Sequence, residues 1–250
     1  AQQTWVLRSS TGNSLCELSD ASDRKLSYRR NVFSSAECSV SLESEAFGLL
    51  HNELLLSGTP QLICYRREDG ANVVRFAGWL AGIQASGDPN EARATLTFND
   101  AFAQLDERFT DGVVEFSAVA QGTIIKSLID TADAVSDLGI STDTANIETG
   151  TVRDRTYENK QVAEAVRQMT EVIDGPDFWV APDDDGTALG ILHVYNEQGS
   201  EQLNAPLQFG SETASNCSDF EVTYLKPRNA ITVLGADSVS YTLIDSASQT

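Results

Sequence analysis

Residue types that often carry out catalysis are few in this sequence of 250 residues, and none has a familiar spacing. A serine or cysteine nucleophile usually needs a nearby histidine as its base, but neither His51 nor His193 lies in such a motif. The four cysteines lack the CxxC spacing that indicates a zinc site: they are Cys16, Cys38, Cys64 and Cys217. We therefore expect structural histidines and buried free thiols, with no catalytic residue, no metal ligand and no cofactor.

The longer motifs of common enzyme classes are also missing: the sequence contains no GxSxG, HExxH, P-loop or GxGxxG pattern. The acidic run at 183–186 begins like a calcium loop, but the later ligands of an EF-hand do not follow, and a solvated turn is expected. A pair of carboxylates, as used by many glycoside hydrolases, leaves no local pattern among 37 acidic residues. The sequence thus favours a non-enzymatic protein, and a hydrolase remains an alternative.

Aromatic residues offer a second kind of site. Trp5, Trp79 and Trp179, with Phe178, could line a platform that binds a sugar ring. The more common role of such residues is packing, either in a core or between subunits. A carbohydrate-binding module is therefore kept as an alternative, and packing is the expectation.

Charge is strongly acidic and unevenly spread, with a net value of −20. There are 10 Lys and Arg against 14 Asp and Glu up to Thr110, and 7 against 23 from Asp111 onward. Binding to nucleic-acid phosphates requires the opposite sign, so ordinary DNA binding is excluded. An acidic surface can serve solubility, or it can line a channel through which a duplex slides without sticking.

The elements that would position these residues begin with strands. Alternation of apolar and polar residues at 36–43 and 92–98 predicts half-buried strands, while 73–84 is apolar on both sides, as in a strand buried twice or lying against a neighbouring subunit. Gly78 and Gly82 suggest bends or bulges there, and a short helix is expected from Ser44. Residues 1–111 are therefore predicted to form a first antiparallel β-barrel or sandwich domain.

Helical spacing replaces this alternation in a segment predicted to span 112–175. One helix should bury Ile124, Ile125, Leu128, Ile129 and Ala132 on one face. A second should begin after an Asn159 cap, carry an apolar stripe from Val162 to Ile173, and end at Gly175-Pro176.

Strand-like segments return at 177–182, 188–196, 220–225 and 229–235, which predicts a second β domain over 176–250. The expected fold class is mainly β (α+β), with two small antiparallel tube-like β-barrel or sandwich domains and a helical segment inserted between them. No apolar run is long enough to cross a bilayer, and the first ten residues do not form a signal peptide, so we expect a soluble product made in the cytoplasm without membrane insertion.

Taken in order, these segments resemble the tail hub (baseplate hub) proteins of long-tailed bacteriophages, a family of minor tail proteins at the tail tip. The order and spacing carry the resemblance, above all RDRTYENKQVAEAVRQM leading to DFWV. The other matching segments are YRRNVFSSAECSVSLE, VVRFAGWLAGIQ followed by TLTFNDAFAQLDERF, TIIKSLID with the downstream GIST, and PRNAITVLG.

The resemblance implies a structural virion protein of the phage tail tip, made in the host cytoplasm. It implies a homotrimer whose two barrels per subunit form a pseudo-sixfold ring. The ring would join the tail tube or distal tail protein to the tip and gate the channel for tape measure protein and DNA. Expected partners are the distal tail, tail tube, tape measure and tail-tip or fibre proteins, with DNA only as transient cargo.

In this reading the important residues make oligomer or core contacts, two roles that the sequence does not separate. They are Phe76, Trp79 and Leu80 on the barrel strands, and Val162, Val166, Met169, Ile173, Phe178 and Trp179 on and after the second helix. The alternatives are a tail-tip cell-wall hydrolase or carbohydrate-binding module, and a hexameric distal tail protein.

Overall fold

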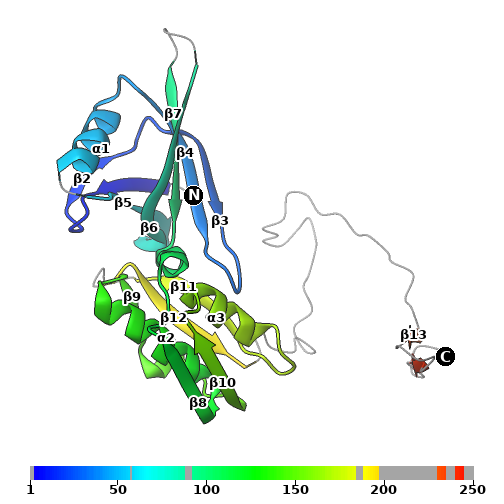
Figure 1. The fold of residues 1–250 in the computed structure, drawn as a ribbon. Helices are drawn as coiled ribbons and strands as arrows, with labels where there is room; N and C mark the ends of the chain where they lie inside the picture. The colour runs from blue at the N-terminus through cyan, green and yellow to red at the C-terminus, as the bar shows by residue number, and fades with distance from the viewer. Residues whose placement is uncertain are drawn as a thin grey trace. The chain divides into compact units, whose positions relative to one another are not determined.

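The computed structural model describes residues 3–56, 58–87, 92–183, 188–196, 230–234 and 240–244 (Figure 1). The chain divides into two compact units, Ala1–Gly199 and Ser200–Thr250. Antiparallel strands dominate, with helices between them, so the expected mainly β fold is confirmed.

A seven-stranded antiparallel sheet forms the first part of the first unit, in the order β2-β1-β5-β6-β7-β4-β3. Both segments predicted from alternation are neighbouring strands in it, with Cys38 opposite Leu96 and Ala36 opposite Phe98. Their apolar faces are buried while the residues between them are partly exposed, as period two requires. The strands are β1 (Gln3–Arg8), β2 (Ser14–Glu17), β3 (Ser22–Ser27), β4 (Ser35–Ser41), β5 (Gln61–Glu68), β6 (Ala71–Ser86) and β7 (Arg93–Asn99).

Strand β6 buries both faces only in its middle, from Phe76 to Gly78, and its residues from Ala81 on are mostly exposed in the single chain. Its register shifts twice, where Arg75 is extra against β5 and Ala81 is extra against β7. The expected irregularity beside Gly82 is therefore confirmed. Gly78 has another role: a Cβ there would lie 2.2 Å from the backbone oxygen of Asn99, so the glycine permits two backbones to approach closely.

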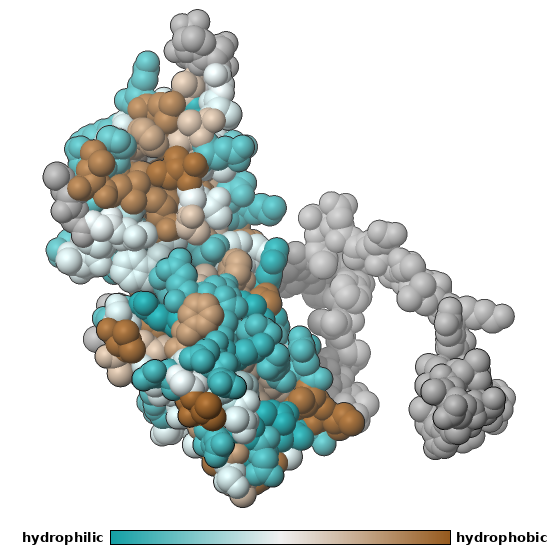
Figure 2. All heavy atoms as spheres, viewed as in Figure 1, coloured by the Kyte–Doolittle hydropathy of each residue, from teal (hydrophilic) through white to brown (hydrophobic). Residues whose placement is uncertain are grey.

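Helix α1 (Glu45–Leu56) lies against β2 and β4, and it confirms the helix expected from Ser44. The apolar faces of the sheet and of α1 form one hydrophobic cluster with Trp5, Leu50, Leu62, Phe76 and Phe98 fully or almost fully buried. Outside this cluster α1 exposes Leu54 and Leu55. Figure 2 shows apolar residues gathered over this part of the unit and mostly hydrophilic residues over the β8–β12 part.

The second part of the first unit alternates strands and helices. Strand β8 pairs antiparallel with β10, while β11 and β12 pair antiparallel and β9 joins β12 in parallel. Figure 1 shows β8 and β10 at the end of this unit away from α1. The elements are the 3-10 helices η1 (Ala101–Glu107) and η2 (Thr144–Asn146), strands β8 (Val113–Ala120), β9 (Ile140–Ser141), β10 (Val152–Glu158), β11 (Asp177–Pro182) and β12 (Gly190–Tyr195), and helices α2 (Gln121–Val135) and α3 (Val162–Thr170).

Helices α2 and α3 bury most of the apolar residues that helical spacing predicted. All five residues predicted for the apolar face of α2 are buried, from Ile124 to Ala132. Helix α3 likewise buries Val162, Val166 and Met169. The strands β8 and β10 were not expected, because 112–175 was predicted to be helical, although Val114 and Phe116 alternate with Glu115 in β8 as strand residues do.

Two details predicted for α3 are wrong. Gln161, not Asn159, occupies the cap position, and Asn159 instead has a positive φ of 45°. The helix ends at Thr170, so Ile173 is 86% exposed and does not extend the apolar stripe. The physical reason lies in the turn that follows, where Gly175 N–H donates to Val172 and Gln121 donates to the Asp174 carbonyl at 3.0 Å. These hydrogen bonds hold a turn that a continuing helix could not form.

The boundary expected near residue 111 is not a break in the core. One hydrophobic cluster joins Ile63, Val74 and Ala77 of the sheet to η1, α2, α3, β11 and β12. Asn31, in the loop before β4, reinforces the junction: its backbone N–H donates to the Phe178 carbonyl, and its side chain accepts from the Phe178 N–H at 2.8 Å. The first unit therefore folds around shared contacts between its two parts.

In the second unit the structure describes a hairpin, β13 (Ala230–Leu234) paired antiparallel with β14 (Ser240–Ile244). Strand β13 confirms the strand expected at 229–235, and β11 and β12 confirm the strands expected at 177–182 and 188–196. The strand expected at 220–225 lies outside the described residues.

Asp100 fixes the start of η1 and provides a pH-dependent test of the fold. Its carboxylate accepts from the N–H groups of Ser34 at 2.6 Å and Phe102 at 3.0 Å, and only 4% of the residue is exposed. Burial raises the pKa of the Asp100 carboxyl from 3.8 to about 7, against the opposing effect of these hydrogen bonds. The folded protein therefore binds this proton more tightly than the unfolded chain does.

Because the pKa of Asp100 is higher in the folded state, protonation of Asp100 stabilises the folded protein. This stabilisation is fully present below about pH 4 and is lost as the pH rises to about 7. Over this window the loss is at most about 4 kcal/mol. We expect the free energy of unfolding of the wild type, minus that of Asp100→Asn, to fall as the pH rises from 4 to 7. Denaturant titrations at several pH values would measure it, and a pH-independent difference would contradict the assignment.

Candidate assembly surfaces

The nine residues singled out from the sequence fall into two groups. Five are buried in the cores of the first unit, which is one of the two roles left open for them: Phe76, Val162, Val166, Met169 and Phe178. Four keep exposed surface, namely Trp79, Leu80, Ile173 and Trp179. Only the second group can contact another molecule without a change of fold.

The three tryptophans do not form a common platform. Trp5 is fully buried and stacks under the Arg24 guanidinium, 5.8 Å from the ring centroid. Trp79 and Trp179 each line a different groove. The sugar-binding arrangement considered from the sequence is thus not assembled by these residues.

Trp179 lies in a groove of about 680 Å³, which we call the arginine groove. Three strands of the first sheet supply its arginines, and β11 supplies the tryptophan. Its lining residues are Gln3, Arg24, Leu26, Tyr28, Arg66, Val73, Val74, Arg75, Trp179, Ala181 and Pro182, with no carboxylate among them. Sequence reasoning missed this site because its residues come from distant segments; the signal was the clustering of arginines near positions 24–30 and 66–75.

The charges of the arginine groove are held in defined places. Glu68 at its margin pairs with both Arg75 and Arg66, the latter at 3.4 Å. The hydrogen bond from Arg75 keeps the pKa of the Glu68 carboxyl below its ordinary value. Arg24 donates to backbone carbonyls, including those of Ala21 at 3.1 Å and Ser19 at 3.0 Å, and has no carboxylate partner within the described residues. The groove therefore carries fixed positive charge on an acidic protein.

An aromatic row continues from Trp179 across the same face of β11 and β12. The Trp179 and His193 rings lie 5.5 Å apart, and His193 stacks on Tyr195 at 5.9 Å. Burial lowers the pKa of His193, so the imidazole is neutral at pH 7. Its Nδ1 forms a hydrogen bond of 3.1 Å with the Tyr195 hydroxyl. This matches the structural role expected for the histidine.

Trp79 borders a second groove, of about 420 Å³, between the β1–β2 turn and the segments that flank β9. Its lining is mostly polar and includes Arg8, Asn13, Gln61 and Asp137. Neither histidine lines it, and the hydroxyl of Ser10, one of its lining residues, donates to the Glu53 carboxylate at 3.0 Å.

The ribbon formed by β8 and β10 presents a face that we call the acidic ribbon face. Its exposed residues include Glu115, Asp154 and Glu158, while Arg153 and Arg155 alternate onto the other face. Asp154 also holds a bulge by accepting from the Ala118 N–H at 2.7 Å. Three carboxylates without a basic neighbour on the same face make this a local anionic surface.

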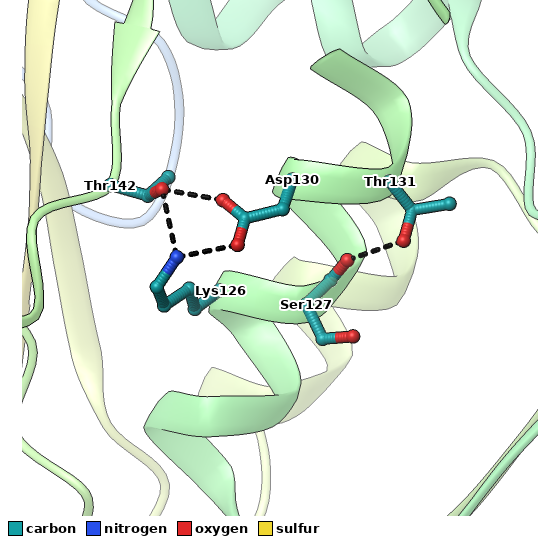
Figure 3. A network of polar contacts seen from close by, with 5 residues as sticks. All are labelled: Lys126, Ser127, Asp130, Thr131 and Thr142. Carbon is teal, nitrogen blue, oxygen red and sulfur yellow. Dashed lines mark hydrogen bonds and ion pairs between the residues drawn. The ribbon is translucent and has the colours of Figure 1, made fainter. Parts of the chain in front are cut away.

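The polar network on α2 has a structural role (Figure 3). Asp130 accepts from Lys126 one turn earlier and from the Thr142 hydroxyl, which also accepts from Lys126 at 3.2 Å. The Thr131 hydroxyl donates a hydrogen bond to the Ser127 carbonyl. The network ties α2 to the residue after β9.

The thiols are also structural where they are described. Cys38 and Cys64 are buried and unpaired, and Cys16 is half-buried and unpaired, while Cys217 lies outside the described residues. Burial raises the pKa of the Cys38 thiol to about 11 and raises that of Cys64 further, which leaves both protonated and unreactive at pH 7. Among the described residues, no group of three His, Cys, Asp or Glu side chains is placed to hold a metal ion. In that part of the chain no helix is both long and apolar enough to span a membrane.

Comparison with known proteins gives a match in structure only. No protein-family model matches the sequence, and no curated protein matches it. The fold is similar to that of a tail protein from Neisseria meningitidis MC58, with a TM-score of 0.53 and 12% identity over 100% of this chain and 69% of that one. It is also similar to a prophage tail protein from Listeria monocytogenes EGD-e, with a TM-score of 0.52 and 12% identity over 97% and 68% of the two chains. At this identity the similarity establishes a shared fold.

Proposed function

We propose that this protein is a structural component of a phage virion, the hub of the tail tip or baseplate. The observation that carries the proposal is the fold, which a tail protein and a prophage tail protein share over nearly all of this chain. The described residues also hold two grooves and an acidic face at which neighbouring proteins can bind.

In the proposed role three copies form a closed ring with pseudo-sixfold symmetry. The ring joins the tail tube or distal tail protein to the tip, gates the channel, and passes the tape measure protein and DNA. Tail-tip or fibre proteins are further partners. Exposed surface at Trp79, Leu80, Ile173 and Trp179 is available for subunit contacts, whereas the five buried residues act by holding the fold. The acidic character of the second half suits a channel wall that repels DNA.

The oligomeric state tests the proposal. We expect native mass spectrometry and light scattering over a concentration series to give a trimer, either for the protein alone or after addition of its sixfold tail neighbour. A hexamer would instead indicate a distal tail protein. A monomer that ignores tail partners would contradict both, and release of muropeptides from peptidoglycan would then identify the hydrolase alternative.

A further inference from the structure

Basic residues of the first part are concentrated in two segments that contribute to the arginine groove. Of the ten Lys and Arg up to Thr110, seven fall in the segments 24–30 and 66–75, which contain only two acidic residues, Glu68 and Asp69. Three of the seven, Arg24, Arg66 and Arg75, line the groove, and Glu68 offsets part of their charge. The groove therefore keeps net positive charge in a protein whose net charge is −20, and a negatively charged partner would complement it.

The chemistry of the arginine groove is that of a protein-binding surface. It combines Arg24, Arg66, Tyr28 and Trp179, and these three residue types are the ones most enriched among residues that dominate binding energy. Tyr28 is 54% exposed, so an aromatic surface is available beside the charges. A carboxylate-bearing protein surface would satisfy both the guanidinium groups and the aromatic rings.

The same chain carries a complementary surface on the acidic ribbon face. Glu115 and Glu158 are exposed there and have no hydrogen-bond or ion-pair partner in the described part of the chain. The ribbon has two strands, and Val113 lies on the same exposed face with 57% of its surface accessible. The opposite face of the ribbon already packs on the core through Phe116, Val119 and Tyr157, so the acidic face is the one left exposed to a partner.

No residue of β8 or β10 lines the arginine groove, so the two surfaces do not meet at this groove within one chain. We infer that, in the ring proposed above, the arginine groove of each subunit receives the acidic ribbon face of a second copy. The contact uses different surfaces on the two partners, and such head-to-tail contacts generate rings when the rotation closes. This inference rests on the proposed function.

Neighbouring arginines provide a matched test. Arg66 lines the groove, and Arg67 is the next residue on β5 and points to the opposite side of the strand. We expect Arg66→Glu to raise the concentration at half-assembly by about tenfold or more, and Arg67→Glu to raise it by less than about threefold. Thermal unfolding of both variants checks that each is folded.

A second charge reversal tests the partner. Glu115→Lys with Glu158→Lys should weaken assembly as Arg66→Glu does, and Glu171→Lys, an exposed residue away from the ribbon, serves as the control. Asp154 is left unchanged because it holds the bulge at Ala118. Combining Arg66→Glu with the two ribbon substitutions restores opposite charges between position 66 and positions 115 and 158 in every contact of a homomeric ring, so assembly should recover by at least about threefold over Arg66→Glu.

The outcomes separate this inference from the proposed function. If the wild type forms trimers but Arg66→Glu and Arg67→Glu behave alike, the inference is overturned and the hub proposal stands. If the combined variant assembles no better than Arg66→Glu, the groove binds a different acidic surface and the inference is again overturned. If the wild type never assembles, with or without tail neighbours, both fail.

Discussion

Gly78→Ala is expected to lower the free energy of unfolding by about 3 kcal/mol, whereas Gly82→Ala on the same strand should change it by less than about 0.5 kcal/mol. A Cβ at position 78 would lie 2.2 Å from the Asn99 oxygen, 2.7 Å from the Asn99 carbonyl carbon and 2.8 Å from Phe76 Cζ. Two of these three atoms belong to backbone, so they cannot move aside as a flexible side chain would. The strands β6 and β7 must separate, and the core beneath them loosens.

Gly82 is the matched control because a Cβ there meets nothing within 4 Å, and its backbone does not have a positive φ. Urea denaturation followed by tryptophan fluorescence would measure both variants. Equal losses of stability would mean that the strand needs glycine for conformational freedom along its length. An unchanged midpoint for Gly78→Ala would contradict the close approach of β6 to β7.

The second large effect is expected at the junction between the sheet and the rest of the first unit. Phe178 is fully buried, and its ring lies 4.6 Å from that of Phe102 in η1. Removing such a ring from a packed core typically costs about 3–5 kcal/mol, because apolar contacts are lost and a cavity remains. We expect Phe178→Ala to lower the free energy of unfolding by this amount.

Trp179→Ala provides the comparison, since Trp179 is the next residue on β11 and points to the opposite face, into the arginine groove. We expect it to lower the free energy of unfolding by only about 1 kcal/mol, because its side chain is only partly buried. Denaturation of the monomer under conditions that prevent assembly would compare the two. A greater loss for Trp179→Ala would mean that the groove residue, rather than Phe178, holds the two parts together.

These two substitutions also distinguish fold from assembly. Phe178 was selected from the sequence together with Trp179, yet adjacent positions on a strand face opposite sides of the sheet. The proposed function requires both a stable subunit and surfaces for its neighbours. Phe178 is fully buried in the core, whereas Trp179 keeps exposed surface in the arginine groove.

The sequence by itself determined the elements whose signal is local. Alternation located β4 and β7, helical spacing identified every buried residue predicted for α2, and apolar content with β-branched and aromatic residues located β11 and β12. These patterns are reliable because each reports which side of one element faces the core. Strand β8 carried a similar pattern, whereas β10 consists mostly of charged residues and has only Tyr157 buried.

Only the tertiary structure decided where α3 ends, which tryptophan is fully buried, and which arginines line a common groove. Helix α3 stops at Thr170, and Gln121, distant in sequence, donates to a carbonyl of the turn that follows. The arginine groove joins Arg24, Arg66 and Trp179, which no local period relates. Local periodicity describes one side of one element, whereas a site at the junction of several elements depends on packing between distant segments.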